Sequence, residues 1–224
     1  MALLPCEQLL LARYVDERPV PIEESFCDVL NLDSLDWRPL PNSAYRHICI
    51  DEDILDHSAF FGAASVSRRI VALMGHMTLA YNPTLPEDGW RAVVAPLGDV
   101  EVGASSCCVA LGDELIVASG RPPALARKVA GFRFAKPPTD PLWFHGSWRQ
   151  LPDLDKARVG GAMAVVDDYL YITGGVDETT GEFHNTAERL AARPRDVEDW
   201  QSVPWFQMPR ALHAHNAFAM PYLE

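Results

Sequence analysis

The sequence predicts an all-β fold made of about four similar antiparallel units, and three observations support this. Four tryptophans lie 53, 58 and 52 residues apart: Trp37, Trp90, Trp148 and Trp200. About 30 residues after a tryptophan comes an apolar run that ends in glycine: Gly75, Gly120 and the pair Gly174–Gly175. Helical periodicity is almost absent from the chain. Because self-similarity at a fixed period is typical of repeat architectures, we interpret the chain as an array of β units.

Within a unit, two short runs rich in small and apolar residues precede the glycine. In the third unit these runs are 160–166 and 169–175, and Asp167-Asp168 stands between them. Two β-prone runs separated by two or three turn residues predict a hairpin. The corresponding turns of the other units are 67–69 and 112–114. A third β-prone run follows a variable polar loop, and its copies are 77–83, 128–137 and 185–194.

The charge of the chain excludes some classes of partner. The 224 residues include 19 basic and 31 acidic side chains, which gives a formal net charge of −12. Nucleic acids and anionic membranes present negative phosphates that need neutralising, so we expect neither as a partner. No apolar run is long enough to span a bilayer. The N-terminal segment lacks the basic region of a secretory signal.

The cysteines indicate a reducing compartment. There are five, and no two form a C-x-x-C pair: Cys6, Cys27, Cys49, Cys107 and Cys108. We therefore expect buried free thiols rather than disulfides, a redox site or a zinc site. Such thiols indicate the cytoplasm or the nucleus, and not secretion.

The repeat resembles the kelch repeat, and the third unit carries most of the likeness. From Trp148 to Trp200 it shows the tryptophan, Leu151-Pro152, Arg158 before an inner strand, the run YLYITGG that ends in the glycine pair, and Asn-x-x-Glu-Arg-Leu. Kelch units are about 50 residues long, and each builds one blade of a β-propeller. The resemblance thus implies a propeller or partial propeller of about four blades. On this view the tryptophans anchor one blade against the next.

The predicted organisation is a single domain, 1–224, with units 38–90, 91–148 and 149–200 and a composite unit of 201–224 plus 1–37. The N-terminal segment offers strands at Leu9–Val15 and Ser25–Leu32, and the C-terminal segment offers one at His213–Ala219. Kelch propellers commonly close by pairing strands from both termini, so we expect His213–Ala219 to pair with Leu9–Val15. A closed four-bladed ring, an open arc completed by a neighbouring subunit and a shortened chain all fit this pattern.

Four residues are candidates for binding a protein or peptide. Arg158 and Arg210 each follow a proline by six residues and precede an inner strand. In kelch proteins that bind peptides an arginine at this place often faces the ligand, so the pair could hold carboxylates. The alternative is a structural salt bridge between blades. Trp143 lies in a Pro-rich insertion and is a candidate contact residue. His213 forms an H-x-H with His215, which could also ligate a metal, but no third ligand is evident.

The resemblance leaves three functions open. Kelch domains commonly serve as adaptors, so we predict a non-catalytic protein-interaction module without cofactor, metal or catalytic residues. The second is an enzyme on the same fold, such as a sugar-acting oxidase or mutarotase. No residues match the two histidines, two tyrosines and cysteine of a galactose-oxidase-like site. The third is a structural subunit of a large assembly. Fold alone does not decide among them.

Overall fold

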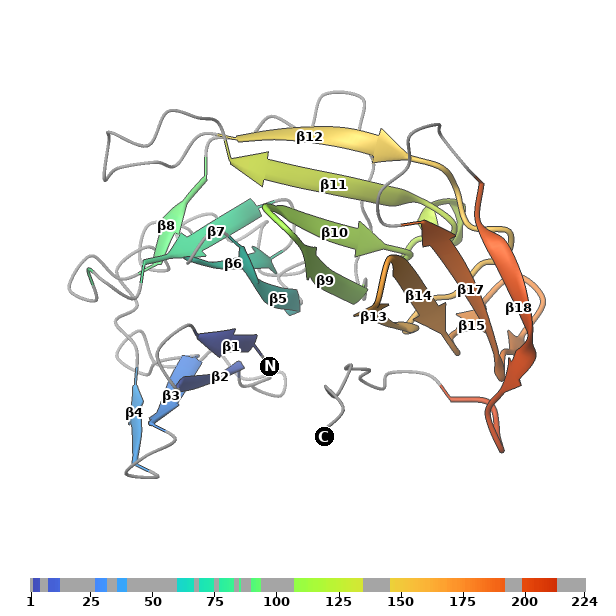
Figure 1. Cartoon of the computed structure of the whole chain (residues 1–224), viewed down its shortest axis with the longest axis horizontal. Coiled ribbons are helices and arrows are strands. Elements are labelled where there is room, and N and C mark those ends of the chain that lie inside the picture. Colours follow the sequence, from blue (N-terminus) through green and yellow to red (C-terminus); the bar gives the residue numbers. More distant parts are fainter. Residues whose placement is uncertain are drawn as a thin grey trace. The chain divides into compact units, whose positions relative to one another are not determined.

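The computed structural model describes the chain in twelve segments. They are residues 2–4, 8–12, 27–31, 36–39, 60–66, 69–74, 77–82, 85, 90–93, 107–134, 146–191 and 199–212. In these segments the regular structure is β-strand, apart from one short 3-10 turn at Pro123–Leu125 (Figure 1). The all-β prediction is confirmed.

Two four-stranded antiparallel sheets come from the first part of the chain. The first sheet has the order β1-β2-β3-β4, with β1 (Ala2–Leu4), β2 (Gln8–Ala12), β3 (Cys27–Asn31) and β4 (Trp37–Pro39). The second sheet has the order β5-β6-β7-β8, with β5 (Phe60–Val66), β6 (Arg69–Met74), β7 (Met77–Tyr81) and β8 (Trp90–Ala92).

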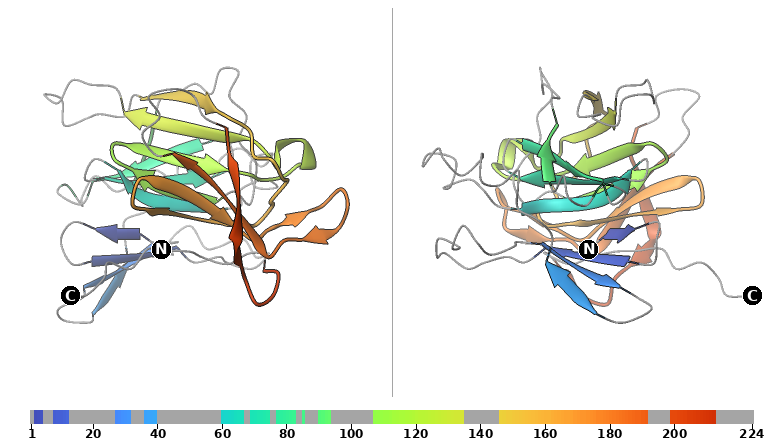
Figure 2. Two further views of the ribbon diagram at one scale, coloured as in Figure 1. Left: turned by 45° about the vertical axis from the view of Figure 1, so that its right-hand side comes forward. Right: turned by 90° about the vertical axis from the view of Figure 1, so that its left-hand side faces the viewer.

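Two further four-stranded antiparallel sheets follow. The third sheet contains β9 (Cys107–Leu111), β10 (Glu114–Ala118), β11 (Val129–Phe134) and β12 (Gly146–Leu151), in chain order. The fourth sheet has the order β13-β14-β17-β18, with β13 (Ala162–Val166), β14 (Tyr169–Thr173), β17 (Thr186–Ala191) and β18 (Gln201–Gln207). Between β14 and β17 the chain forms a small hairpin of β15 (Val176–Asp177) and β16 (Glu182–Phe183), which projects from the fourth sheet (Figure 2).

Each sheet repeats one plan. In the second, third and fourth sheets the first two strands are the hairpin that the sequence predicts, and the third strand is the run after the variable loop. The fourth strand of each sheet contains or directly follows a repeat tryptophan, namely Trp37, Trp90, Trp148 and Trp200. The tryptophan that ends a unit of the sequence therefore lies in or next to the last strand of that unit's sheet.

The first sheet bears on one predicted strand pairing. Strand β2 covers most of the predicted strand Leu9–Val15, and both of its edges are paired. Leu9 pairs with Leu3 of β1 on one edge and with Leu30 of β3 on the other. The predicted pairing of Leu9–Val15 with His213–Ala219 is therefore wrong for the described residues 9–12. Residues 213–224 lie outside the described segments, so the composite unit of 201–224 plus 1–37 stays a prediction.

The chain forms two compact units. The first is residues 1–95 and 134–146, and the second is residues 96–133 and 147–224. Nearly all of the third sheet and all of the fourth sheet belong to the second unit. No helix in the described part of the chain is long and apolar enough to cross a membrane.

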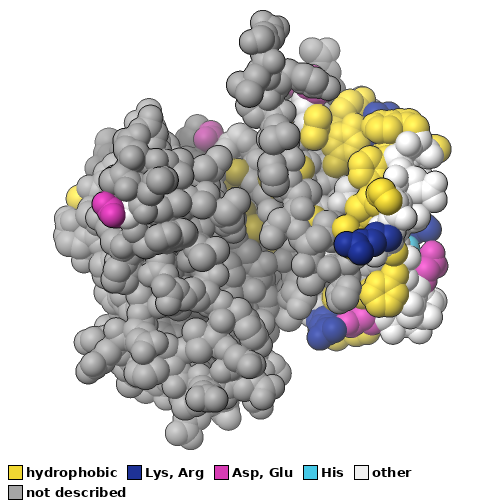
Figure 3. All heavy atoms as spheres, turned by 90° about the horizontal axis from the view of Figure 1, so that it is seen from below, with side chains coloured by type: hydrophobic (Ala, Val, Ile, Leu, Met, Phe, Trp, Pro, Cys, Tyr) yellow, Lys and Arg dark blue, Asp and Glu magenta, His cyan; other side chains and the backbone are white. Residues whose placement is uncertain are grey.

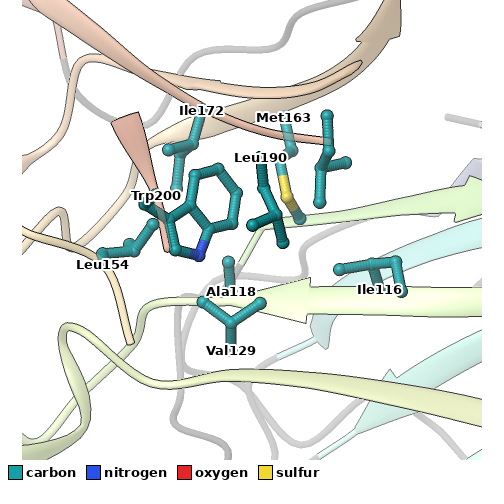
Figure 4. Close-up of a cluster of buried hydrophobic side chains, with 9 residues drawn as sticks. Ile116, Ala118, Val129, Leu154, Met163, Ile172, Leu190 and Trp200 are labelled. Atoms are coloured by element: carbon teal, nitrogen blue, oxygen red, sulfur yellow. The ribbon is translucent and has the colours of Figure 1, made fainter. Parts of the chain in front are cut away.

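The core of the second unit lies between its two large sheets. Trp200 is 3% exposed and packs with apolar side chains from the third sheet, from the fourth and from the loop between them (Figure 4). The cluster is Ile116, Ala118, Val129, Leu154, Met163, Leu170, Ile172, Leu190 and Trp200. The indole Nε1 of Trp200 donates to the carbonyl oxygen of Pro152 at 3.0 Å. The prediction that a repeat tryptophan anchors one blade on the next is confirmed for Trp200.

Candidate functional site

Arg158 lies just before the fourth sheet, and its guanidinium is enclosed. Nε donates to Oε1 of Glu188 at 2.7 Å. Nη1 donates to the carbonyl oxygens of Gly174 at 2.7 Å and Thr186 at 3.0 Å, and Nη2 donates to Oγ1 of Thr186 at 3.0 Å. All three guanidinium nitrogens therefore have acceptors inside the sheet, and the side chain is 1% exposed.

Glu188, the partner of Arg158, lies on β17 and holds a second segment as well. Its carboxylate accepts the backbone N–H of Asp155 at 2.7 Å and that of Lys156 at 3.3 Å. Burial of this carboxylate is tolerated because both of its oxygens accept charge-assisted hydrogen bonds, which offset the loss of water. The pair Arg158–Glu188 thus fastens residues 155–158 to the fourth sheet.

The glycine pair that follows β14 allows the backbone of Arg158 to pack closely against it. Gly174 and Gly175 have φ of 63° and 85°, in the region that favours glycine. A Cβ on Gly175 would lie 2.6 to 2.8 Å from the backbone of Arg158. The Arg158 carbonyl also accepts a hydrogen bond from Oγ of Ser119, at the end of β10, at 2.9 Å. The doublet therefore permits the close approach that places Arg158.

His184 is buried beside this network. Its Nε2 lies 3.0 Å from the carbonyl oxygen of Ala157, and its Nδ1 lies 3.5 Å from Oε1 of Glu182. Burial lowers the pKa of the imidazole below its usual range, and the nearby charge of Arg158 lowers it further. His184 is thus a neutral hydrogen-bonding group in the fold at neutral pH.

The structure treats the predicted binding residues differently. Arg158 forms a structural salt bridge, which was the alternative to a ligand-binding role. The salt bridge joins it to Glu188 of the fourth sheet and not to another blade. Its nitrogens are already occupied by Glu188, Gly174 and Thr186, so a partner carboxylate has no access to them in this arrangement. Arg210 is exposed, in contrast to Arg158. The predictions for Trp143 and His213 fall on residues outside the described segments.

The sequence analysis did not select Trp205, which is the most exposed large apolar residue of the described segments, at 73%. It lies on β18, the edge strand of the fourth sheet. Glu188 pairs with Ser202 and Thr186 pairs with Gln207, so β18 carries a bulge between these two pairs. The ring of Trp205 lies 6.4 Å from that of Phe206. Two signals in the sequence point to it: it is outside the tryptophan register, and it follows Pro204.

A shallow groove lies on the inner side of this bulge, with a volume of about 260 Å³. We name it the bulge groove. Its lining residues come from β17, from β18 and from the segment held by Glu188: Lys156, Thr186, Ala187, Ser202, Val203, Pro204, Phe206 and Gln207. Apolar side chains and one lysine therefore line the same place on the edge of the sheet.

The thiols of the second unit have little nucleophilic character. Cys107 and Cys108 are free. Burial raises the pKa of each thiol to about 12, so both are protonated at neutral pH. In the described segments no three His, Cys, Asp or Glu side chains lie close enough to hold a metal ion.

Comparison with known families identifies the repeat. The family model of the kelch motif matches residues 157–190, which span β13, β14 and β17 and contain both Arg158 and Glu188. Residues 157–190 thus carry a kelch motif. The four antiparallel sheets are consistent with a partial kelch propeller. None of the curated proteins matches the chain.

The kelch motif also bears on function at a coarse level. Kelch blades are stacked β units, and such scaffolds display loops and edges that recognise other proteins. The kelch match thus supports a protein-interaction propeller module. Within the matched repeat, Arg158 and Glu188 maintain the fold, while Trp205, on the adjoining edge strand, faces solvent.

Proposed function

We propose that this kelch-repeat chain is a non-catalytic protein-interaction module, an adaptor or scaffold that binds a protein or peptide partner. The observation that carries the proposal is the exposure of Trp205, at 73%, on a strand of the fourth blade. The proposed compartment is the cytoplasm or the nucleus, which the free thiols of Cys107 and Cys108 support.

Trp205 has the physical properties of an interface anchor. A tryptophan buries a large apolar area when covered, and tryptophan is enriched among the residues that dominate binding energies. In the isolated chain the indole of Trp205 stays in contact with water, so the free energy of burying it is gained only when a partner covers it. Strand β18 is paired with β17 on both sides of the bulge, so its backbone is already ordered before a partner covers the ring.

The edge of the fourth blade is suited to contact through side chains rather than to strand addition. Pro204 removes one backbone donor from β18, and the bulge between Ser202 and Gln207 interrupts its straight edge. Both features discourage pairing with a further strand. A partner would therefore engage the aromatic side chains of β18 and not extend the sheet.

The chemistry of the other candidate groups supports a role in binding rather than catalysis. The thiols of Cys107 and Cys108 have a pKa of about 12 and are poor nucleophiles. Arg158 is committed to Glu188 and to backbone carbonyls. The alternatives of an enzyme on the same scaffold, or of a neighbouring subunit that completes an arc, have no comparable described group in their favour.

The proposal is tested by photo-crosslinking in cells that express the intact chain. A benzophenone amino acid replaces Trp205 in one variant and Phe183 in a control variant. Phe183 is a suitable control because it is an aromatic residue of the same unit and is 53% exposed. We expect a discrete crosslinked protein from position 205 and not from position 183. Equal crosslinking from both positions, or none from either, would overturn the proposal.

A further inference from the structure

The bulge groove has a specific charge pattern. Lys156 is the only charged side chain among its lining residues, and the others are neutral or apolar. The chain as a whole carries a net charge of −12 and has only three lysines. Figure 3 shows hydrophobic side chains beside lysine or arginine side chains on the described part of one face. The groove therefore places a lysine side chain among neutral and apolar residues, in a chain that is acidic and poor in lysine.

The backbone of Lys156 is fixed by hydrogen bonding, whereas its side chain is exposed enough to meet a partner. Its backbone N–H donates to Glu188, which also binds Arg158, so the buried ion pair positions the residue. Its side chain is 45% exposed, and its Nζ lies 3.9 Å from Oε1 of Glu182, itself mostly exposed. An exposed pair at this distance contributes little stability. An incoming carboxylate can therefore replace Glu182 at low cost.

The apolar lining offers a second contact. Pro204 and Phe206 belong to the bulge of β18, and Ala187 and Val203 lie beside them in the groove. Burial of an apolar side chain against these residues is favourable, roughly in proportion to the area removed from water. The groove thus combines an apolar contact area with a single cation.

We propose that the bulge groove binds a protein segment in which a carboxylate stands next to a large apolar side chain. The carboxylate pairs with Nζ of Lys156, and the apolar side chain packs against Pro204 and Phe206. Trp205, at the outer side of the bulge, covers the neighbouring part of the partner. This inference rests on the proposed binding function and specifies the chemistry of the partner.

The test uses a random 12-residue peptide library displayed on phage and selected on the intact chain. The affinities of enriched peptides are then measured by fluorescence polarisation for the wild type and for Lys156→Gln, Lys128→Gln and Trp205→Ala. Lys128 provides the matched control, because it is a partly exposed lysine of the same unit that pairs with Asp153 outside the groove. Circular dichroism establishes that each variant is folded.

We expect enriched peptides to carry Asp or Glu within two residues of Leu, Phe or Trp. Lys156→Gln should weaken their binding by about tenfold, while Lys128→Gln changes it less than about twofold. The charge-reversed variant Lys156→Glu should prefer peptides in which Lys replaces the acid. Peptides without an acid, or equal affinities for Lys156→Gln and Lys128→Gln, would overturn the inference.

The failure of this inference and that of the proposed function give different results. Peptides that lose affinity with Trp205→Ala but not with Lys156→Gln would leave the binding function in place and reject the carboxylate site. A library from which no peptide is enriched, combined with no crosslink at position 205, would reject both.

Discussion

Arg158 and Glu188 are joined by a hydrogen-bonded ion pair of 2.7 Å, and each side chain is only 1% exposed. Burying two charges is costly, and the cost is offset only where every donor and acceptor finds a partner. Here the remaining contacts of both groups go to Gly174, Thr186 and the backbone of 155–156. The pair therefore joins β17, the end of β14 and the segment that leads into β13.

Replacing Arg158 should destabilise the fold strongly. Arg158→Met leaves the Glu188 carboxylate buried without its counter-ion, and breaking a buried pair in this way costs about 3–5 kcal/mol. The free energy of unfolding, measured by urea titration with circular dichroism, should fall by that amount. The double variant Arg158→Met, Glu188→Met should recover part of the loss because no charge is left unpaired. A single variant as stable as the wild type would contradict the structural role of the pair.

The glycine doublet offers a test in which steric clash and backbone strain are separated. Gly175→Ala places a Cβ 2.6 Å from the Arg158 carbonyl oxygen at a φ of 85°. Gly181→Ala is the control, because Gly181 has a φ of 74° but no atom within 4 Å of the position that a Cβ would take. We expect a loss of about 1–2 kcal/mol for Gly181→Ala from backbone strain alone. Gly175→Ala should lose roughly 3 kcal/mol or more.

The two glycine variants are compared by thermal unfolding of the intact chain. The difference between them isolates the contact with Arg158. If Gly175→Ala and Gly181→Ala lowered the melting temperature equally, the close approach of Gly175 to the Arg158 backbone would not exist in solution.

The sequence predicted the repeat well because its signals are local and recur: the tryptophans occur four times, and the hairpin turns and terminal glycines three times. The turn Asp167-Asp168 and the pair Gly174–Gly175 each mark a strand end within a few residues, so β13 and β14 could be placed closely. The kelch resemblance is carried by the third unit, and the kelch model matches within that unit. The role of Trp200 as an anchor also follows from its regular spacing.

Other features depend on pairing that no local signal reveals. Strand β1 has three residues, which is too few for a periodic pattern, and it occupies one edge of β2, whose other edge pairs with β3. Glu188 stands 30 residues after Arg158, and only the register of β17 selects it among 31 acidic side chains. The exposure of Trp205 follows from the bulge in β18, which depends on the pairing of Thr186 with Gln207.

The cysteines of the third blade should resist thiol reagents. With a pKa of about 12, roughly one thiol in ten thousand is ionised at pH 8, and only the thiolate reacts. A variant with Cys6, Cys27 and Cys49 replaced by serine keeps only Cys107 and Cys108. Reaction with an aromatic disulfide reagent at pH 8 should be very slow in buffer and fast in urea. Labelling of Cys107, which packs against the core cluster, within minutes in buffer would show that the core between the third and fourth sheets is open.

The stability of the chain should decrease in mild acid through His184. Burial holds the pKa of this imidazole below its usual value in the folded state, whereas the unfolded chain has a pKa of about 6.5. As the pH falls through 6.5, the unfolded state therefore binds a proton that the folded state does not bind. Proton linkage then lowers the free energy of unfolding, and the contribution of His184 is fully present only above that pH.

Urea titrations at pH 7.5, 6.5 and 5.5 measure this effect, with His184→Gln as the comparison. Glutamine can keep a donor near the carbonyl oxygen of Ala157 but does not titrate. The charged groups near His184 are Glu182, Asp177, Lys156 and Arg158, and they remain in both proteins. We expect the wild type to lose more stability than His184→Gln between pH 7.5 and 5.5. Equal losses would show that His184 takes up its proton as readily in the folded chain as in the unfolded one, and that the histidine is not enclosed beside Arg158.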